Sequence, residues 1–201
     1  MTRIRSLLVA LTFALLPAAV AAQEIPLADL SAYLNSLTTA EASFSQQNAD
    51  GSVSTGHLYI HRPGRARFEY DPPDRSLVIA SSGTVGVFDP KSNTPPAQYP
   101  LGRTPLNLIL ARNIDLSQAR MVVSHQAVGD RTVVVAEDPD HPEYGTIALV
   151  FSADPIALRQ WVVTDDSGGQ TTVTLSKLTT GGVMRDSLFD MTAEAERRAG
   201  R

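Results

Sequence analysis

The stretch LYIHRPGRARFEY, residues 58–70, decides the fold because it predicts two strands joined by a tight turn at Pro63-Gly64. A two-residue turn would pair Arg62 with Arg65 and would mix apolar and charged side chains on each face of the hairpin. A three-residue turn, residues 63–65, leaves one face apolar except for Arg62, so we predict this longer turn. Its register pairs Arg62 with Ala66, Ile60 with Phe68 and Leu58 with Tyr70.

The hairpin also sorts its basic side chains. Arg62 alone falls on the apolar face, whereas the turn and the polar face hold the others, Arg65, Arg67, His57 and His61. We expect the residues of the polar face to be solvated charges beside Glu69. Burying an unpaired guanidinium costs several kcal/mol, so Arg62 must either extend to the rim of the sheet or donate to carbonyl groups or a carboxylate. The residues alone leave both arrangements open.

The rest of the chain predicts one amphipathic helix followed by a long run of short strands. Apolar residues recur at three- and four-residue spacing behind Pro26, which indicates the helix. The period then changes to two, with Gly, Pro, Asp and Ser between the strands. About eleven strands in meander order predict a mainly β fold, an incomplete antiparallel β-barrel. The expected strands are 42–47, 55–61, 66–70, 76–80, 84–89, 121–127, 132–137, 146–152, 158–164, 171–178 and 183–189.

One apolar segment interrupts the strands. The sequence GRTPLNLILARN, residues 102–113, places Thr104 as an N-cap and Pro105 at the first position of a short helix. Leu106, Ile109 and Leu110 then fall on one side of that helix. A short apolar helix within a β-meander must cover something, and the open mouth of a curled sheet is the expected place.

The N-terminal residues 1–22 are typical of a secretory signal peptide. Arg3 and Arg5 precede an apolar run at residues 7–16, which small residues follow up to Ala22. Cleavage after Ala21 and cleavage after Ala22 both fit. Residues 23–201 then form one domain, whose charged tail from about residue 193 is a candidate for disorder. A secreted domain without cysteine is most simply placed in a bacterial periplasm.

Charge and motifs exclude several classes of function. Without the signal peptide the chain carries 15 basic and 21 acidic side chains, a net charge of −6, which disfavours nucleic acid as a partner. The sequence holds no nucleophile elbow, phosphate loop or His-Glu-x-x-His motif. His57 and His61 would lie about 13 Å apart on a strand, too far to share a metal. The loop at residues 138–145 lacks the spacing of a calcium loop, so we expect no enzyme, cofactor or metal site.

Four stretches together resemble the LolA family of periplasmic outer-membrane lipoprotein carriers: FSQ at 44–46, GHLYIHRPGRARFEYDPP at 56–73, VFDP at 87–90 and TPLNLILARN at 104–113. The resemblance implies an incomplete barrel with a helical lid over an apolar cavity. It implies that the cavity takes the acyl chains of lipoproteins from an inner-membrane lipoprotein-releasing ABC transporter. The cargo would then pass to an outer-membrane acceptor or receptor, and a shuttle of this kind is expected to be a monomer.

The resemblance also assigns roles to residues. Arg62 aligns with an arginine that latches the lid closed, and the lid helix would comprise Thr104, Pro105, Leu106, Ile109 and Leu110. Large apolar side chains would line the cavity, namely Phe44, Leu58, Ile60, Phe68, Tyr70 and Trp161. Ala66 and Gly86 stand where aromatic residues are common in the family, which leaves the shape of the cavity open.

Three other functions stay open on sequence alone. One is a periplasmic binder or sensor of another lipid or lipid-linked envelope component, which would usually need a second domain. Another is a carrier of polysaccharide or hopanoid components. The third is a periplasmic hydrolase that uses His125 or the loop at residues 138–143. A hydrolase would require a nucleophile close to a histidine in space.

Overall fold

A computed structural model describes residues 24–92, 94–118 and 120–200. The expected signal peptide, residues 1–22, lies outside the described residues. The helices are α1 (Leu27–Ser36), α2 (Leu106–Leu110) and α3 (Met191–Arg198), and the 3-10 helices are η1 (Leu101–Arg103), η2 (Pro142–Tyr144) and η3 (Asp186–Phe189). The strands are β1 (Thr39–Gln47), β2 (Val53–His61), β3 (Arg65–Tyr70), β4 (Leu77–Ser81), β5 (Thr84–Phe88), β6 (Ala97–Pro100), β7 (Val122–Val128), β8 (Arg131–Glu137), β9 (Thr146–Ala153), β10 (Ile156–Thr164) and β11 (Gln170–Thr180).

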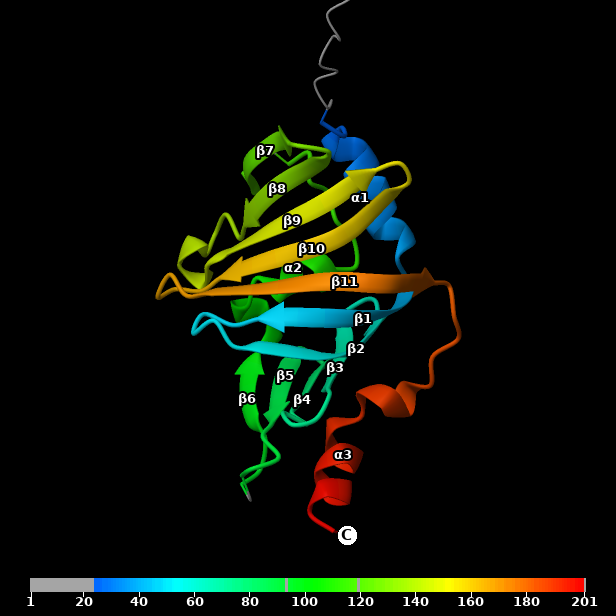
Figure 1. The fold of residues 1–201 in the computed structure, drawn as a ribbon, viewed down its shortest axis with the longest axis vertical. Coiled ribbons are helices and arrows are strands. Elements are labelled where there is room, and N and C mark those ends of the chain that lie inside the picture. Colours follow the sequence, from blue (N-terminus) through cyan, green and yellow to red (C-terminus); the bar gives the residue numbers. More distant parts are fainter. Residues whose placement is uncertain (1–23, 93, 119, 201) are drawn as a thin grey trace, which may run out of the picture.

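The strands described by the structure form one antiparallel sheet in the order β6-β5-β4-β3-β2-β1-β11-β10-β9-β8-β7 (Figure 1). Sequence neighbours pair through short turns, and β1 pairs with β11 to join the two ends of the chain. The sheet does not close, because β6 and β7 are its two edges and do not pair with each other. The chain crosses between those edges through η1 and α2. The predicted mainly β, unclosed barrel is confirmed.

The hydrophobic core lies between the concave face of the sheet and the helices α1 and α2. Strands that alternate buried and half-buried residues, such as β8, direct one set of side chains into it. Leu30 and Leu34 of α1 and Ile109 and Leu110 of α2 belong to the same cluster. Helix α1 confirms the predicted amphipathic helix, although Pro26 occupies its N-cap position. The two helices therefore cover the open side of the sheet.

The hairpin of residues 58–70 has the predicted faces but a different register. Its turn holds three residues, 62–64, and the strands pair Ile60 with Ala66, Leu58 with Phe68 and Gly56 with Tyr70. Each pairing is thus offset from the predicted one by two residues on one strand, which leaves every side chain on its predicted face. Gly56 accommodates this register, because a Cβ there would lie 2.1 Å from the Glu69 carbonyl oxygen of β3. The predicted pairing of Arg62 with Ala66 was wrong, because Arg62 lies in the turn.

The chain after β11 also departs from the prediction. Residues 183–189 were expected to form a strand, but the chain leaves the sheet at Gly181, where φ is +80°. It continues as η3 and then α3, whose Asp190 N-cap accepts from the Ala193 backbone N–H at 3.0 Å. The tail from about residue 193, a candidate for disorder, therefore lies largely in a helix. Strand β6 was not predicted, because its residues AQYP end in proline.

Figure 1 shows the path of this C-terminal segment, residues 182–198. It leaves the end of β11 and passes to α3 beside the half of the sheet that contains β3 to β5. There, Met191 and Ala195 of α3 pack on a second cluster formed by Leu77, Ile79 and Phe88. The two faces of this half of the sheet thus have different covers, α2 on the concave face and the C-terminal segment on the outer face.

Candidate functional site beneath helix α2

Helix α2 and η1 form the covering segment, which crosses the open side of the sheet. Within this segment Pro105, Ile109 and Leu110 are buried, while Thr104 and Leu106 are half-buried. Thr104 is not the predicted N-cap, because Pro105 holds that position and the Thr104 hydroxyl donates to the Leu101 carbonyl at 2.8 Å. The helix is therefore shorter than the predicted segment, but its apolar side faces the sheet as expected.

The structure brings the predicted cavity residues together under α2. Phe44 packs edge-to-face on Phe68 and Tyr70, with ring centroids 5.7 and 5.1 Å apart. Phe68 makes the same contact with Trp161 at 6.3 Å. Leu58 and Ile60 are buried in the same cluster. These six side chains form one apolar surface.

Tyr70 supplies a polar group at this surface. Its hydroxyl donates to Gln46 Oε1 at 2.7 Å. Burial raises the pKa of Tyr70 to about 12, so the phenol stays neutral and keeps its hydrogen at physiological pH. The remaining predicted cavity residues present only hydrocarbon or indole, and all of them are less than one-tenth exposed. The surface therefore suits an apolar ligand much better than a charged one.

Arg62 joins the covering segment to α1. It sits in the β2–β3 turn, where its Nε donates to the Ala111 carbonyl at 3.0 Å. Its Nη atoms donate to the carbonyls of Leu34 and Arg112 and to Asn35 Oδ1. Burial lowers the pKa of Arg62 from its usual value of 12.5, but a guanidinium remains charged in proteins. Of the two arrangements that the sequence left open, Arg62 adopts the one in which it donates to carbonyl groups, on both α1 and the end of α2.

Backbone contacts of the turn reinforce this link. The Arg62 N–H donates to the Thr38 carbonyl and the Gly64 N–H donates to the Leu110 carbonyl, each at 2.8 Å. Gly64 adopts a φ of +71°, a conformation that glycine tolerates at no steric cost. The turn therefore holds the end of α2 through its backbone as well as through the Arg62 side chain.

Asn35 also holds the chain that follows α2, and the sequence did not predict this role. Its Nδ2 donates to the Ile114 carbonyl at 2.8 Å, and its Oδ1 accepts from the Ile114 N–H at 2.9 Å. Ser31, one helical turn earlier, accepts from the Leu116 N–H at 2.9 Å. The four-residue spacing of these two polar residues along α1 was the available signal. Together they fix the chain just after α2.

The outer face of β3 corrects another expectation. Arg67 was predicted to be a solvated charge, yet it is buried and only 6% exposed. It donates to Glu69 Oε1 at 2.6 Å, to the Leu188 carbonyl at 3.0 Å and to Glu194 Oε2 at 3.2 Å. Arg65, predicted in the turn, begins β3 and pairs with Asp186. The C-terminal segment covers this face and supplies partners to both arginines.

We expect acid to weaken this contact. Burial raises the pKa of Glu194, but the hydrogen bond from Arg198 and the charge and hydrogen bond of Arg67 outweigh it and hold the pKa below its usual 4.5. A carboxyl group with a lowered folded-state pKa stabilises the fold fully above 4.5, and this stabilisation is lost as the pH falls through the folded-state value. Limited proteolysis of the C-terminal segment should therefore accelerate as the pH falls below 4.5, while a Glu194→Gln variant should lack this pH dependence.

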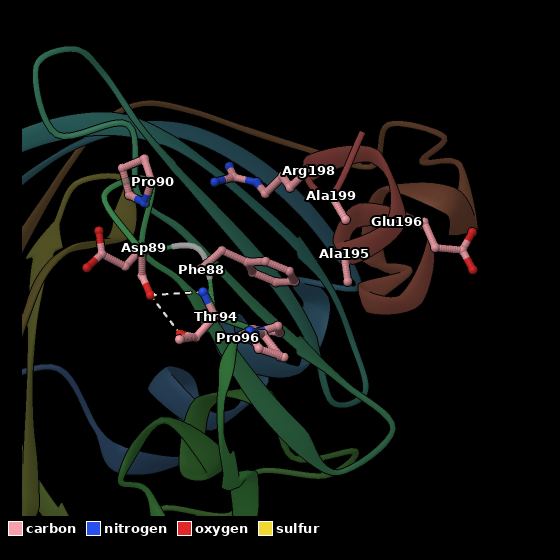
Figure 2. A pocket seen from close by; sticks show the side chains of 11 residues that line it. Phe88, Asp89, Pro90, Thr94, Pro96, Ala195, Glu196, Arg198 and Ala199 are labelled. Carbon is pink, nitrogen blue, oxygen red and sulfur yellow. Dashed lines mark hydrogen bonds between the residues drawn. The ribbon is translucent and has the colours of Figure 1, made fainter. Parts of the chain in front are cut away.

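A hollow of about 690 Å³ lies elsewhere, between the β5–β6 connection and α3. Figure 2 shows Arg198 and Ala195 of α3 near Phe88, with Glu196 turned away. The Arg198 guanidinium lies 5.5 Å from the Phe88 ring centre and donates to Glu194 Oε1 at 2.9 Å, so its charge is already engaged. None of the predicted cavity residues lines this hollow. It is separate from the surface under α2.

The histidines and the acidic loop have local roles. His125 Nε2 lies 3.0 Å from the Ile25 carbonyl, and His61 Nε2 lies 2.9 Å from Arg65 Nη2. In the loop after β8, the ring of His141 stacks on Tyr144. Within residues 24–92, 94–118 and 120–200, no three His, Asp or Glu side chains are close enough to bind a metal ion. Over the same residues, no helix is both long and apolar enough to span a membrane.

The family model for "Outer membrane lipoprotein carrier protein LolA" matches residues 35–192. The chain belongs to the LolA family. The match includes Arg62, the covering segment and η3, and it ends at the start of α3. Most of α3 thus lies beyond the part of the chain that the LolA model describes.

LolA relatives match most of the chain at low identity. An outer-membrane lipoprotein carrier protein from Chromohalobacter salexigens is 25% identical over 168 residues, which are 80% of this chain and 79% of the relative. Another from Methylococcus capsulatus is 25% identical over 182 residues, 87% of this chain and 86% of the relative. A solved LolA superfamily protein from Nitrosomonas europaea covers 83% of this chain and 98% of its own, with 8% identity and a TM-score of 0.45.

Proposed function

We propose that this protein carries lipoproteins through the periplasm by binding their acyl chains beneath α2. The observation that carries this proposal is the Arg62 latch, which holds a short apolar lid over a continuous apolar surface. Membership of the LolA family supports the same role, since the relatives are named outer-membrane lipoprotein carriers. On this proposal α2 is the lid helix and the six apolar residues beneath it contact the cargo.

The energetics fit a carrier that must both bind and release. Each methylene removed from water contributes about 0.8 kcal/mol, so sheltering ten of them contributes roughly 8 kcal/mol before the cost of opening. In the closed state Phe44, Phe68 and Trp161 already pack against one another, so an acyl chain has to displace these contacts and the lid. The closed, empty state therefore competes with the loaded one and keeps net affinity moderate.

The proposal includes two membrane partners. An inner-membrane lipoprotein-releasing ABC transporter would supply the cargo, and an outer-membrane acceptor or receptor would take it. Between them the carrier would travel as a soluble monomer, because its task is to shield acyl chains during diffusion through water. No step in this cycle requires a catalytic group or a cofactor.

Native mass spectrometry of the protein isolated from periplasm tests the cargo. We expect a fraction of it to carry a triacylated lipoprotein that organic solvent releases. The matched control is a co-expressed lipoprotein whose acylated cysteine is replaced by serine, and this cargo should not bind. Equal capture of both forms would contradict the proposal, and recovery of a bare lipid would indicate a carrier of another envelope component.

A further inference from the structure

The β2–β3 turn, residues 62–64, is linked to elements on both faces of the sheet. Arg62 leaves the turn on the concave face and holds the end of α2. The residues that flank the turn, His61 and Arg65, are directly paired across the hairpin. Their side chains lie on the outer face, where η3 packs against β3. The latch and the C-terminal segment therefore meet at the same three-residue turn.

Arg65 is the center of the contact on the outer face. Its Nη1 donates to Asp186 Oδ1 at 2.5 Å, and its Nη2 lies 2.9 Å from His61 Nε2. Its guanidinium carbon lies 5.6 Å from the centre of the Phe189 ring. Phe189 is 2% exposed and packs edge-to-face on His61 at 5.9 Å. The C-terminal segment thus contacts both strand ends that flank the turn. We call these contacts of Asp186 and Phe189 with Arg65 and His61 the clamp.

We propose that Arg65 is a positioning residue for the Arg62 latch and that the C-terminal segment helps to keep the lid closed. Only residues 62–64 separate the clamped strand ends, so movement of those ends shifts the Arg62 and Gly64 backbones directly. The Gly64 N–H bonds to Leu110 of the lid helix, and the Arg62 N–H bonds to Thr38, which lies between α1 and β1. Tightening the clamp favours the closed lid.

This coupling runs in both directions. Since a coupling free energy between two sites is reciprocal, opening the lid must loosen the C-terminal segment to the same degree. The outer face would then differ between the closed and open states, although the cargo lies on the other face. The significance for cargo rests on the function proposed above, whereas the coupling itself is a property of the empty protein.

Hydrogen–deuterium exchange of the empty protein tests the coupling with an Asp186→Asn variant. Asp186 is highly exposed, so its substitution removes the ion pair without creating a cavity. We expect the lid residues 104–111 and the turn residues 62–64 to exchange about threefold faster, the size expected for losing an exposed ion pair. Asp186→Glu keeps the carboxylate and should restore slow exchange.

The control is Asp130→Asn, which removes a similarly exposed ion pair to Arg131 at the β7–β8 turn. Its exchange at the lid should equal that of the unmodified protein. For the reciprocal test, Arg62→Leu should accelerate exchange in residues 184–198. If Asp186→Asn accelerated exchange only in the C-terminal segment, that segment would not be coupled to the lid and the proposal would be wrong. This result would leave the lipid-carrier function untouched, because no cargo is present.

Discussion

Replacing Arg62 with leucine is expected to reduce delivery of lipoprotein to outer membranes more than tenfold while leaving the fold intact. Losing the charged hydrogen bonds to Leu34 and Ala111 removes about 2 kcal/mol from the closed, empty state. Cargo affinity should then rise about thirtyfold, because the competing state is weaker. The variant should accept cargo and retain it. The measurement is the transfer of labelled lipoprotein from the isolated complex to outer-membrane vesicles.

Two variants make this result specific. Arg112→Leu removes a neighbouring exposed guanidinium. This variant should deliver normally, because Arg62 contacts the backbone carbonyl of residue 112 and not its side chain. Arg62→Lys keeps the charge but lacks the planar fork that reaches several carbonyls, so its delivery should be intermediate. Delivery by the Arg62→Leu protein at the normal rate would show that the latch does not control release.

Replacing Glu194 with glutamine is expected to lower the free energy of unfolding by about 3 kcal/mol. Glu194 is 2% exposed and accepts hydrogen bonds from Arg67, Arg197 and Arg198. Neutralising it leaves the buried Arg67 guanidinium with weaker partners, which is costly at low dielectric. Urea denaturation followed by Trp161 fluorescence measures the change.

Glu196 provides the matched control for this substitution. It lies on the same helix and is exposed, and it points away from Phe88 in Figure 2. Glu196→Gln should change stability by less than about 0.5 kcal/mol. A similar loss for both variants would mean that helix propensity, not the buried ion cluster, holds α3 on the sheet.

The sequence was sufficient for ten of the eleven strands and for the faces of the hairpin strands. Leu58, Ile60 and Phe68 were assigned to the apolar face correctly although the register was wrong, because an offset of two residues preserves the alternation of a strand. The resemblance to LolA implied a lid helix and a latch at Arg62, and these roles stay predictions. The hydrogen-bond partners of Arg62 could not be predicted, since backbone carbonyls such as those of Leu34 and Ala111 carry no signal in the sequence.

Contacts between distant segments explain the remaining errors. Arg67 reads as a surface charge until Leu188 and Glu194, more than a hundred residues later, pack over it. The segment 183–189 was expected to form the last strand, in which residues 183 and 189 would share a face, yet Val183 is fully exposed and Phe189 is buried. Local periodicity could not show that the chain leaves the sheet at Gly181.

The segment that we propose as the lid is anchored at each end, and this limits how it moves. Before α2, the Leu101 N–H donates to the Gly83 carbonyl at 2.8 Å, and after it Ile114 is held by Asn35. A segment tethered on both sides stays at a high effective concentration near its seat. Loops of about ten residues close in roughly 10–100 ns, so an unobstructed lid would reseat almost at once. The dwell time of cargo should therefore depend on how fast the acyl chains leave, and should be independent of carrier concentration.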